Sequence, residues 1–168
     1  MLTKYNGETM RWVYGLAFFL VVIGLSRFLE FPPNFTPIIA GAVFLPFICR
    51  GITFSLLPVL VMLITDVFLG FHEVMLFTYG AILLIGLFAQ SVQWSLGVKA
   101  LVGVLVWHLV VNFGVYLNSE PTRTLFDVYV SAWPFDFRLL VSTLLFSGLF
   151  WSIKALIERN TVANFADQ

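Results

Sequence analysis

Long apolar runs separated by short polar segments dominate this sequence and constrain its fold more than any other feature. A helix that crosses a membrane needs roughly 20 consecutive apolar residues. Six runs are candidates for such helices, at about residues 11–29, 37–49, 52–69, 74–92, 99–117 and 137–157. The sequence therefore predicts an all-α, polytopic membrane protein, in which a six-helix transmembrane bundle forms a single domain over residues 1–168.

The second run differs from the others in length. It extends from Pro37 to Cys49, about 13 residues, which is short of the roughly 20 that a full crossing needs. Either the segment is a short tilted helix that borrows flanking residues, or it enters the membrane without crossing it. The small residues Ala40, Gly41 and Ala42 suit close packing against another helix in both cases.

The composition supports a lipid bilayer as the solvent and excludes some functions. Hydrophobic residues make up 60% of the chain and charged residues 11%, against about half and about a quarter in soluble domains. The net charge is zero and lysine and arginine are not clustered, which argues against a nucleic-acid partner. The single cysteine, Cys49, excludes an internal disulfide and a multi-cysteine metal site.

The amino terminus imitates a signal peptide, because Lys4 and Arg11 precede the first apolar run. This run is too long for the apolar region of a typical signal peptide, and no small-residue cleavage motif follows it. We therefore expect a retained membrane helix preceded by a short cytoplasmic tail at residues 1–10.

The placement of lysine and arginine predicts the orientation of the bundle. With both termini in the cytoplasm, most basic residues face inward, in agreement with the positive-inside tendency. The inward residues are Lys4, Arg11, Arg50, Lys99, Lys154 and Arg159, and the outward residues are Arg27, Arg123 and Arg138. We expect a multi-pass protein of a bacterial inner membrane with both termini cytoplasmic.

In this orientation three polar segments converge over the outer mouth of the bundle. They are the proline-rich loop around Asn34, the segment Asp66–Glu73 and the long segment Asn118–Asp136. A protein that captures a solute needs polar loops above a pocket of this kind. The sequence thus predicts a substrate site at the outer face.

Asp66 lies near the end of the third span, where a carboxylate is costly and needs a specific reason. It is either a substrate ligand in an outer pocket or an interfacial group that caps the turn at Gly70 or pairs with Arg27. His72 and Glu73 could join it around a divalent metal, since imidazole and carboxylate suit such ions. Their spacing matches no standard site, so we expect no bound metal and no cofactor.

His108, Asn112 and Asn34 are further polar positions that bear on the pocket. His108 and Asn112 are four residues apart in the fifth span and share a helix face that Tyr116 continues. They either line the pocket or form helix–helix hydrogen bonds, and we favour the helix–helix role for His108 and the pocket for Asn112. Asn34 either points its amide into the mouth or satisfies its own turn.

The remaining polar residues indicate no catalytic chemistry. Arg27 and Glu30 are three residues apart and are expected to pair with each other or with Asp66. The sequence contains no nucleophile elbow, phosphate-binding loop or zinc-protease motif, and no carboxylate pair has a spacing that implies hydrolysis. We therefore predict no catalytic residues and no enzyme activity.

Several stretches of the chain resemble an uncharacterised bacterial integral-membrane family. They extend from about Arg27 to Phe150 and read R-F-L-E-F-P-P-N-F-T-P-I, T-D-V-F-L-G-F-H, V-M-L-F-T-Y-G, V-N-F-G-V-Y and Y-V-S-A-W-P-F-D-F-R-L-L. That family is similar to the S components of energy-coupling-factor (ECF) transporters in size, number of spans and loop placement.

The similarity to S components implies an architecture and a mode of action. It implies a six-helix bundle whose outward pocket is closed by the first, third and fifth loops, with an outer lid at Trp133-Pro134-Phe135. S components bind a vitamin, a vitamin precursor or a metal ion, and they topple when docked to a shared transmembrane partner driven by two ATPases. By this resemblance, the substrate-binding residues are Asn34, Asp66, His72, Tyr79 and Asn112.

The chain departs from the S components in two places. Many of them dock through an alanine-x-x-x-alanine pattern on the first helix, where this chain offers Gly15, Ala17, Gly24 and Ser26. The nickel and cobalt members rely on a histidine near the amino terminus, and none stands beside Met1 here. These departures leave the coupling partner open and argue against a metal substrate.

The sequence favours a substrate-binding integral-membrane component of a small-molecule, vitamin-like uptake transporter that captures its solute at the outer face. The alternative is a non-transporting membrane scaffold of similar fold, comparable to the small rod-shape membrane proteins. An enclosed polar cavity beneath the loop at Asn34, or a bound non-protein molecule there, favours capture, whereas a bundle packed solid there favours the scaffold. If Asp66 belongs to the pocket, Asp66→Asn should abolish ligand binding without unfolding the bundle.

Overall fold

The computed structural model describes residues 2–166, and within them the side-chain burial of residues 13 and 15–159. The described residues form six α-helices and two 3-10 helices and contain no strand, which confirms the all-α prediction. In chain order the elements are α1 Leu2–Ser26, α2 Ile38–Phe44, η1 Leu45–Phe47, η2 Ile52–Ser55, α3 Leu56–Leu69, α4 Met75–Ser91, α5 Leu96–Leu117 and α6 Leu125–Ala166.

Three predicted spans agree closely with the helices. η2 and α3 together cover Ile52–Leu69, an apolar segment long enough to cross a membrane. α4 lies within one residue of the predicted 74–92 at each end. α5 ends where predicted but begins three residues earlier, because the Ser95 side chain caps its amino terminus by accepting from the Val98 N–H.

The first and last helices are longer than predicted. α1 begins at Leu2, so the expected polar tail at residues 1–10 is helical from its second residue. Met1 and the side chains of Lys4 and Arg11 lie outside the described residues. α6 begins at Leu125 rather than near 137, which corrects two predictions. The loop predicted at 118–136 ends at 124, and the expected lid at 133–135 is part of a helix.

A capping box explains the early start of α6. The Thr124 hydroxyl accepts from the Asp127 N–H, and the Asp127 carboxylate accepts from the backbone N–H and hydroxyl of Thr124. This arrangement satisfies donors that a helix start leaves without partners. The helix continues through Pro134 although that residue has no N–H to donate. The Tyr129 hydroxyl also donates to the Leu109 carbonyl at 2.6 Å, which ties this part of α6 to α5.

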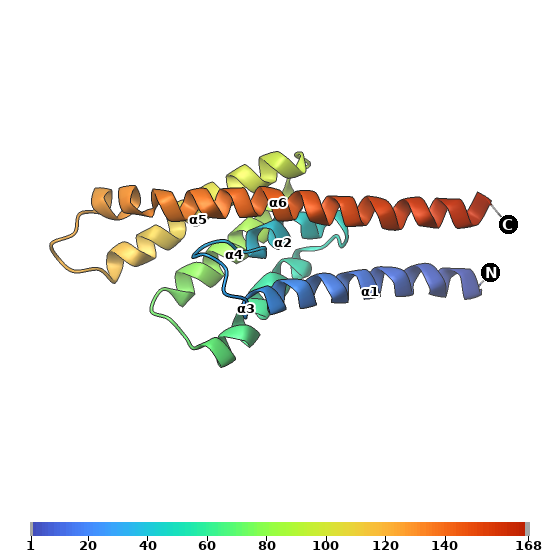
Figure 1. The fold of residues 1–168 in the computed structure, drawn as a ribbon, viewed down its shortest axis with the longest axis horizontal. Coiled ribbons are helices and arrows are strands. Elements are labelled where there is room, and N and C mark those ends of the chain that lie inside the picture. Colours follow the sequence, from blue (N-terminus) through green and yellow to red (C-terminus); the bar gives the residue numbers. More distant parts are fainter. Residues whose placement is uncertain (1, 167–168) are drawn as a thin grey trace.

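The helices run alternately back and forth between two ends of the bundle (Figure 1). α1 begins and α6 ends at one end, toward which the α2–α3 and α4–α5 connections also lie; we call it the terminal end. The α1–α2, α3–α4 and α5–α6 connections lie toward the opposite end, the loop end, where the α5–α6 hairpin extends furthest. The three polar segments singled out in the sequence therefore face the same end of the bundle.

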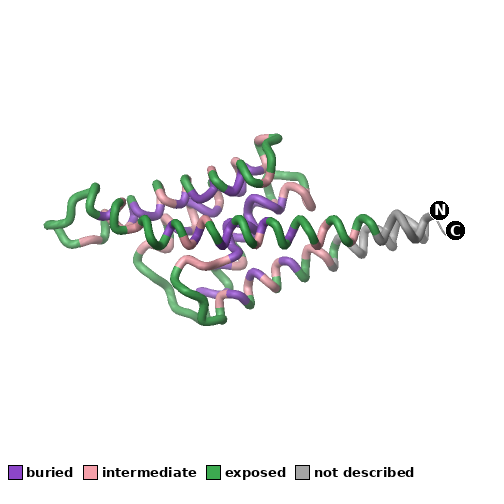
Figure 2. The backbone as a smooth tube through the Cα atoms, turned by 45° about the horizontal axis from the view of Figure 1, so that its top comes forward, coloured by how far each residue is buried: buried purple, intermediate pink, exposed green. Residues whose placement is uncertain are grey.

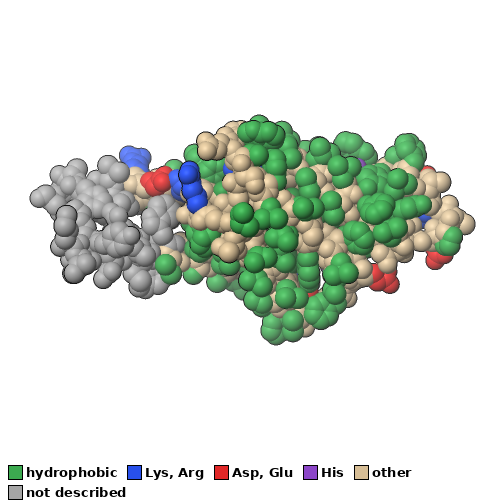
Figure 3. Space-filling model, turned by 180° about the vertical axis from the view of Figure 1, so that it is seen from behind, with side chains coloured by type: hydrophobic (Ala, Val, Ile, Leu, Met, Phe, Trp, Pro, Cys, Tyr) green, Lys and Arg blue, Asp and Glu red, His purple; other side chains and the backbone are tan. Residues whose placement is uncertain are grey.

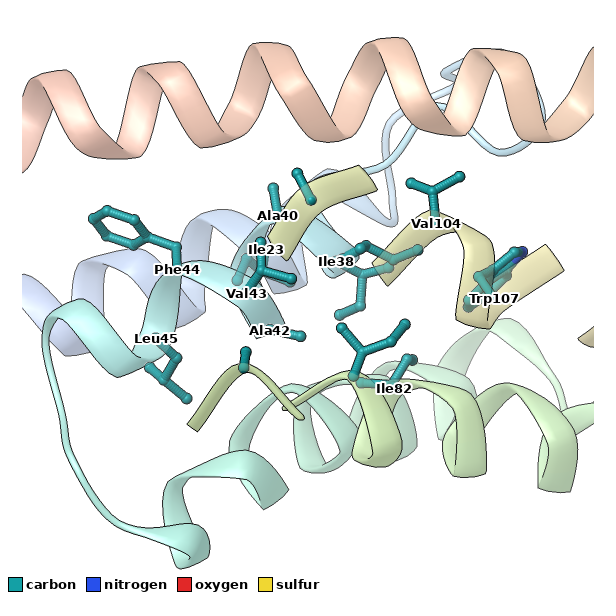
Figure 4. Close-up of a cluster of buried hydrophobic side chains, with 14 of the residues drawn as sticks. Ile23, Ile38, Ala40, Ala42, Val43, Phe44, Leu45, Ile82, Val104 and Trp107 are labelled. Atoms are coloured by element: carbon teal, nitrogen blue, oxygen red, sulfur yellow. The ribbon is translucent and has the colours of Figure 1, made fainter. Parts of the chain in front are cut away.

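α2 is the centre of the hydrophobic core. All seven of its residues are buried, and it packs against each of the other α-helices, as Figure 4 shows for several of its side chains. Its glycine permits this packing, because a Cβ added to Gly41 would lie 2.5 Å from Ile23 Cδ1. α2 and η1 together measure about 16 Å, roughly half the hydrocarbon thickness. The short run at 37–49 is thus a buried core element, and the chain needs the flanking connections as well as α2 and η1 to pass from the loop end to the terminal end.

The outer surface of the bundle is apolar. Figure 2 shows exposed positions along the outward sides of the helices, and hydrophobic side chains dominate the face in Figure 3, where most visible charges lie toward the ends. Among the described residues, three segments are long and apolar enough to cross a membrane: Ile52–Leu69, Leu96–Leu117 and Leu125–Arg159. Lipid solvates such a surface, whereas monomeric soluble proteins rarely expose it. Its large exposed side chains include Phe18, Phe68, Leu76, Phe126, Phe137 and Leu145.

Candidate ligand-binding site

Two clusters of buried and half-buried polar side chains lie in the half of the bundle toward the loop end. Each cluster is built around one carboxylate and joins parts of the chain that are far apart in sequence. The arginine cluster consists of Arg27, Thr65, Asp66 and Tyr79, and the aspartate cluster consists of Asn34, His108, Asn112 and Asp136.

In the arginine cluster, Arg27 follows the last residue of α1 and reaches α3. Its Nη1 lies 2.7 Å from Asp66 Oδ1, and it donates to the Thr65 hydroxyl at 2.8 Å and to the Met62 carbonyl at 3.2 Å. Tyr79 on α4 donates its hydroxyl to Asp66 Oδ2 at 2.6 Å. Asp66 is only 1% exposed, and both of its oxygens face protein donors. From the sequence, Arg27 is expected to pair with Glu30 or with Asp66, and the structure shows the ion pair with Asp66.

Asp136 on α6 is the centre of the aspartate cluster. Its Oδ2 lies 2.7 Å from His108 Nδ1 and accepts a 2.9 Å hydrogen bond from Asn112 Nδ2, both on α5. Asn34 Nδ2, in the α1–α2 connection, reaches Asp136 Oδ1 at 3.5 Å. Asp136 is 6% exposed, so its hydrogen bonds largely replace those that water would supply. The cluster therefore holds the α1–α2 connection against the α5–α6 pair.

The backbone of the α1–α2 connection aims Asn34 at Asp136. Asn34 has a φ of 63°, in the left-handed region that asparagine tolerates better than most residues. Two residues later the Thr36 N–H donates to Ser142 Oγ on α6 at 3.3 Å, and the Ser142 hydroxyl lies 3.2 Å from the Thr36 carbonyl oxygen. The Phe35 ring packs edge-on against Phe146 of the same helix. These contacts fix the connection across α6 beside Asp136.

A cavity of about 260 Å³ adjoins the aspartate cluster between α5 and α6. Its polar lining consists of Asn34, Asn112, Ser131 and Asp136. This volume lies just below the roughly 300–1,000 Å³ of typical small-molecule sites, which also combine apolar walls with a few convergent polar groups. The apolar part of the wall is formed by Trp107, Val111, Val115, Val128, Ala132 and Phe135.

The cavity presents mainly hydrogen-bond acceptors. Asp136 contributes a carboxylate, and the hydrogen bonds of Asn34 and Asn112 among the described residues use their amide nitrogens. The two amide carbonyl oxygens can therefore accept from a ligand. This set suits a small molecule that carries N–H or O–H donors. Within the part of the chain that the structure describes, no group of three or more His, Cys, Asp or Glu residues is placed to hold a metal.

The structure distributes the predicted substrate-binding residues over three places. Asn34 and Asn112 line the cavity. Asp66 and Tyr79 belong to the arginine cluster, and neither of them lines the cavity. His72 is exposed in the α3–α4 connection. Two of the five predicted residues thus line the cavity beside Asp136, and the other three lie outside its lining.

Asp136 is the central residue that sequence reasoning missed. The sequence predicts Asp136 at the end of a loop, because the preceding segment is rich in polar and aromatic residues. The capping box of Thr124 and Asp127 is the signal that could have found it, since a helix starting there carries Asp136 well inside an apolar stretch. His108 hydrogen-bonds across to α6, as the helix–helix alternative expected, and Asn112 both bonds to Asp136 and lines the cavity.

The part of the chain that the structure describes is an all-helical bundle with an apolar surface, buried polar clusters and three segments long enough to cross a membrane. These features fit a helical membrane protein. The chain belongs to DUF6580, a family of unknown function whose model matches residues 7–165. The match covers both clusters and the cavity. No curated protein and no solved structure matches the chain.

Proposed function

We propose that this protein is the substrate-binding integral-membrane component of a small-molecule uptake transporter. The cavity beside Asp136 carries the proposal, because it combines apolar walls with convergent polar groups, among them Asn34 of the α1–α2 connection; it is open to the surface and is not the enclosed cavity expected from the sequence. A scaffold that works only through its outer surface has no need of such a cavity. This observation favours capture of a solute over the alternative of a non-transporting membrane scaffold.

We place the loop end at the outer face of a bacterial inner membrane and the terminal end in the cytoplasm. The positive-inside tendency supports this orientation. Arg50 and Lys99 lie in or beside the connections toward the terminal end, and Lys154 and Arg159 lie on the last turns of α6. Arg123, by contrast, lies in the α5–α6 connection at the loop end. The cavity then belongs to the outer half of the bundle.

The α1–α2 connection is the gate in this mechanism. Asn112 is about 8 Å along α5 from its loop-end terminus, so a ligand beside it is only partly sunk into the bundle. The contact of Asn34 with Asp136 is long, at 3.5 Å, and a ligand donor can replace it at the same carboxylate oxygen. In this mechanism the α1–α2 connection moves away from Asp136 when the ligand enters and moves back over the bound ligand to close the site.

Delivery to the cytoplasm requires a partner in this proposal. The resemblance to ECF S components supports a transmembrane coupling subunit with ATPases, which would bind the bundle after capture. The substrate is a vitamin-like small molecule with hydrogen-bond donors, because the cavity lining is rich in acceptors.

Substitution of Asp136 tests the site directly. The wild-type protein, purified in mild detergent, is expected to carry a small molecule that mass spectrometry of the extract identifies. Asp136→Asn should weaken its binding by about tenfold or more, because one charged hydrogen-bond acceptor is lost. The matched control is Glu120→Gln, which neutralises an exposed carboxylate in the α5–α6 connection and should leave the affinity unchanged.

Binding should be measured by titration of the identified molecule, and thermal unfolding should confirm that both variants are folded. An Asp136→Asn protein that is folded and binds with wild-type affinity would remove Asp136 from the site. A wild-type protein that carries no small molecule but co-purifies with other membrane proteins would favour the scaffold.

A further inference from the structure

A second cavity lies toward the terminal end, opposite to the aspartate cluster. It has a volume of about 440 Å³ and is formed by the α2–α3 and α4–α5 connections and the first turn of α5. We call it the basic pocket, because two cations and no carboxylate line it. Its polar and aromatic lining includes Arg50, Gln90, Ser91, Gln93, Trp94 and Lys99.

Lys99 is the unusual residue of the basic pocket. Its side chain is on the first turn of α5 and the residue is only 3% exposed. The ammonium donates to the Ala89 carbonyl at 2.7 Å and lies 4.8 Å from the centre of the Phe47 ring. None of the ion pairs among the described residues includes Lys99 or Arg50. A buried ammonium has three donors, and one carbonyl satisfies only one of them.

Two physical costs accompany a lysine at this position. Removal of a charge from water is expensive unless an opposite charge or several hydrogen bonds compensate it. The amino terminus of a helix carries a partial positive charge, so a cation on its first turn is repelled and an anion is favoured. An anion bound beside Lys99 would remove both costs at once.

Orientation of the protein does not by itself explain the burial of Lys99. The positive-inside tendency requires a cation near the cytoplasmic side of the membrane, and an exposed residue such as Arg50 meets that requirement. A buried cation that lines a cavity, as Lys99 does, differs from an exposed one because the cavity beside it can hold an anion.

The basic pocket also has a fixed wall. The Gln90 side chain accepts from the Gly51 N–H at 3.4 Å and donates to the Cys49 carbonyl at 3.2 Å, so it joins α4 to the α2–α3 connection. Because Lys99 itself donates to the Ala89 carbonyl on α4, the two links together place the connection that carries Arg50 and the helix start that carries Lys99 at the same end of α4. Both cations are thus placed at one cavity before any ligand binds.

We propose that the basic pocket binds a phosphate-type anion through Lys99 and Arg50. The anion is either a soluble phosphate compound or the phosphate of an anionic lipid headgroup, and both would use the same two cations. The proposal does not rest on solute capture at Asp136, since the two sites share no lining residue.

The test uses the full-length protein in nanodiscs of neutral phosphatidylcholine. One arm adds inorganic phosphate at constant ionic strength, with chloride as the control anion, and the other replaces part of the lipid by phosphatidylglycerol. We expect a saturable rise of the unfolding temperature in at least one arm. Lys99→Met should abolish this rise, and Arg50→Gln should weaken the apparent affinity by about tenfold or more. Arg123→Gln, at the loop end, should respond like the wild type.

A response to phosphate identifies a soluble anion as the ligand, and a response to phosphatidylglycerol alone identifies a lipid headgroup. The absence of a saturable response in both arms overturns the proposal. An equal response of wild type and Lys99→Met also overturns it. If Lys99→Met does not fold, Arg50→Gln decides the matter, because an unchanged affinity in that variant contradicts a site made by both cations.

Discussion

Asp66 and Asp136 are both carboxylates inside apolar helices, yet their neighbours give them different roles. Asp66 pairs with the Arg27 guanidinium and accepts from the Tyr79 hydroxyl, so protein donors from the α1–α2 connection and from α4 surround it. Asp136 is bound by an imidazole and by amides, and a cavity opens beside it. The first arrangement fastens helices together, whereas the second leaves room for a ligand.

Asp66→Asn distinguishes these roles. We expect it to lower the free energy of unfolding by about 2–3 kcal/mol, because Arg27 would keep its charge but lose its counter-ion. This is less than the roughly 3–5 kcal/mol for a fully buried pair, since Arg27 retains partial exposure. Tyr79→Phe should cost about 1 kcal/mol, the value of one hydrogen bond.

The free energies of unfolding of Asp66→Asn and Tyr79→Phe should be measured by equilibrium unfolding in detergent. Glu30→Gln, at an exposed position, is the control. In the double variant Arg27→Gln with Asp66→Asn, the loss should be smaller than the sum of the single losses. If Asp66→Asn instead unfolds like the wild type and loses ligand binding, Asp66 belongs to the substrate site.

Site residues could be predicted from the sequence where a polar side chain stands within an apolar or proline-rich stretch. Asn34 and Asn112 stood out because each interrupts an apolar or proline-rich stretch, and both line the cavity. The contacts of Asp136 depend on how α5 and α6 pack over more than twenty residues of sequence separation, which no local pattern contains. For the same reason the sequence does not show that Asp66 and Asn112 have different partners, Arg27 and Tyr79 for the first and Asp136 for the second.

At the scale of elements, helix centres were predictable and some helix ends were not. Apolar composition located α3, α4 and α5 to within a few residues, since each is predominantly apolar along its length. The start of α6 depended on a short capping interaction at Thr124 and on contacts such as that between Tyr129 and Leu109. These local and tertiary bonds outweighed the helix-breaking tendency of Pro134.

The contact between α4 and α5 depends on a glycine. A Cβ added to Gly114 would lie 2.4–2.8 Å from three atoms of Phe77, including its Cβ, which cannot swing away. We expect Gly114→Ala to destabilise the bundle by about 1–3 kcal/mol, the usual cost of overpacking. Gly80→Ala on α4 is the control, because nothing lies within 4 Å of the added atom. Thermal unfolding of both variants checks this, and equal stabilities would contradict the close approach.

At the scale of the whole molecule, the bundle separates two kinds of polar chemistry. Acceptors gather around Asp136 in the half toward the loop end, and cations line the basic pocket toward the terminal end. The apolar core around α2 lies between the two halves. The alternating course of the helices produces this division, because every second connection returns to the same end.

Cysteine accessibility tests which end faces outward. In a Cys49→Ala background, Glu120→Cys introduces a thiol at the loop end and Gln93→Cys introduces one toward the terminal end, both at exposed positions. A membrane-impermeant maleimide should label Glu120→Cys in intact spheroplasts and Gln93→Cys only after lysis. Labelling of both thiols in intact spheroplasts would contradict the alternating course of α5 across the membrane. The reversed pattern would place the Asp136 cavity on the cytoplasmic side, where it could not capture a solute from outside, and the uptake proposal would fail even if the cavity binds a ligand.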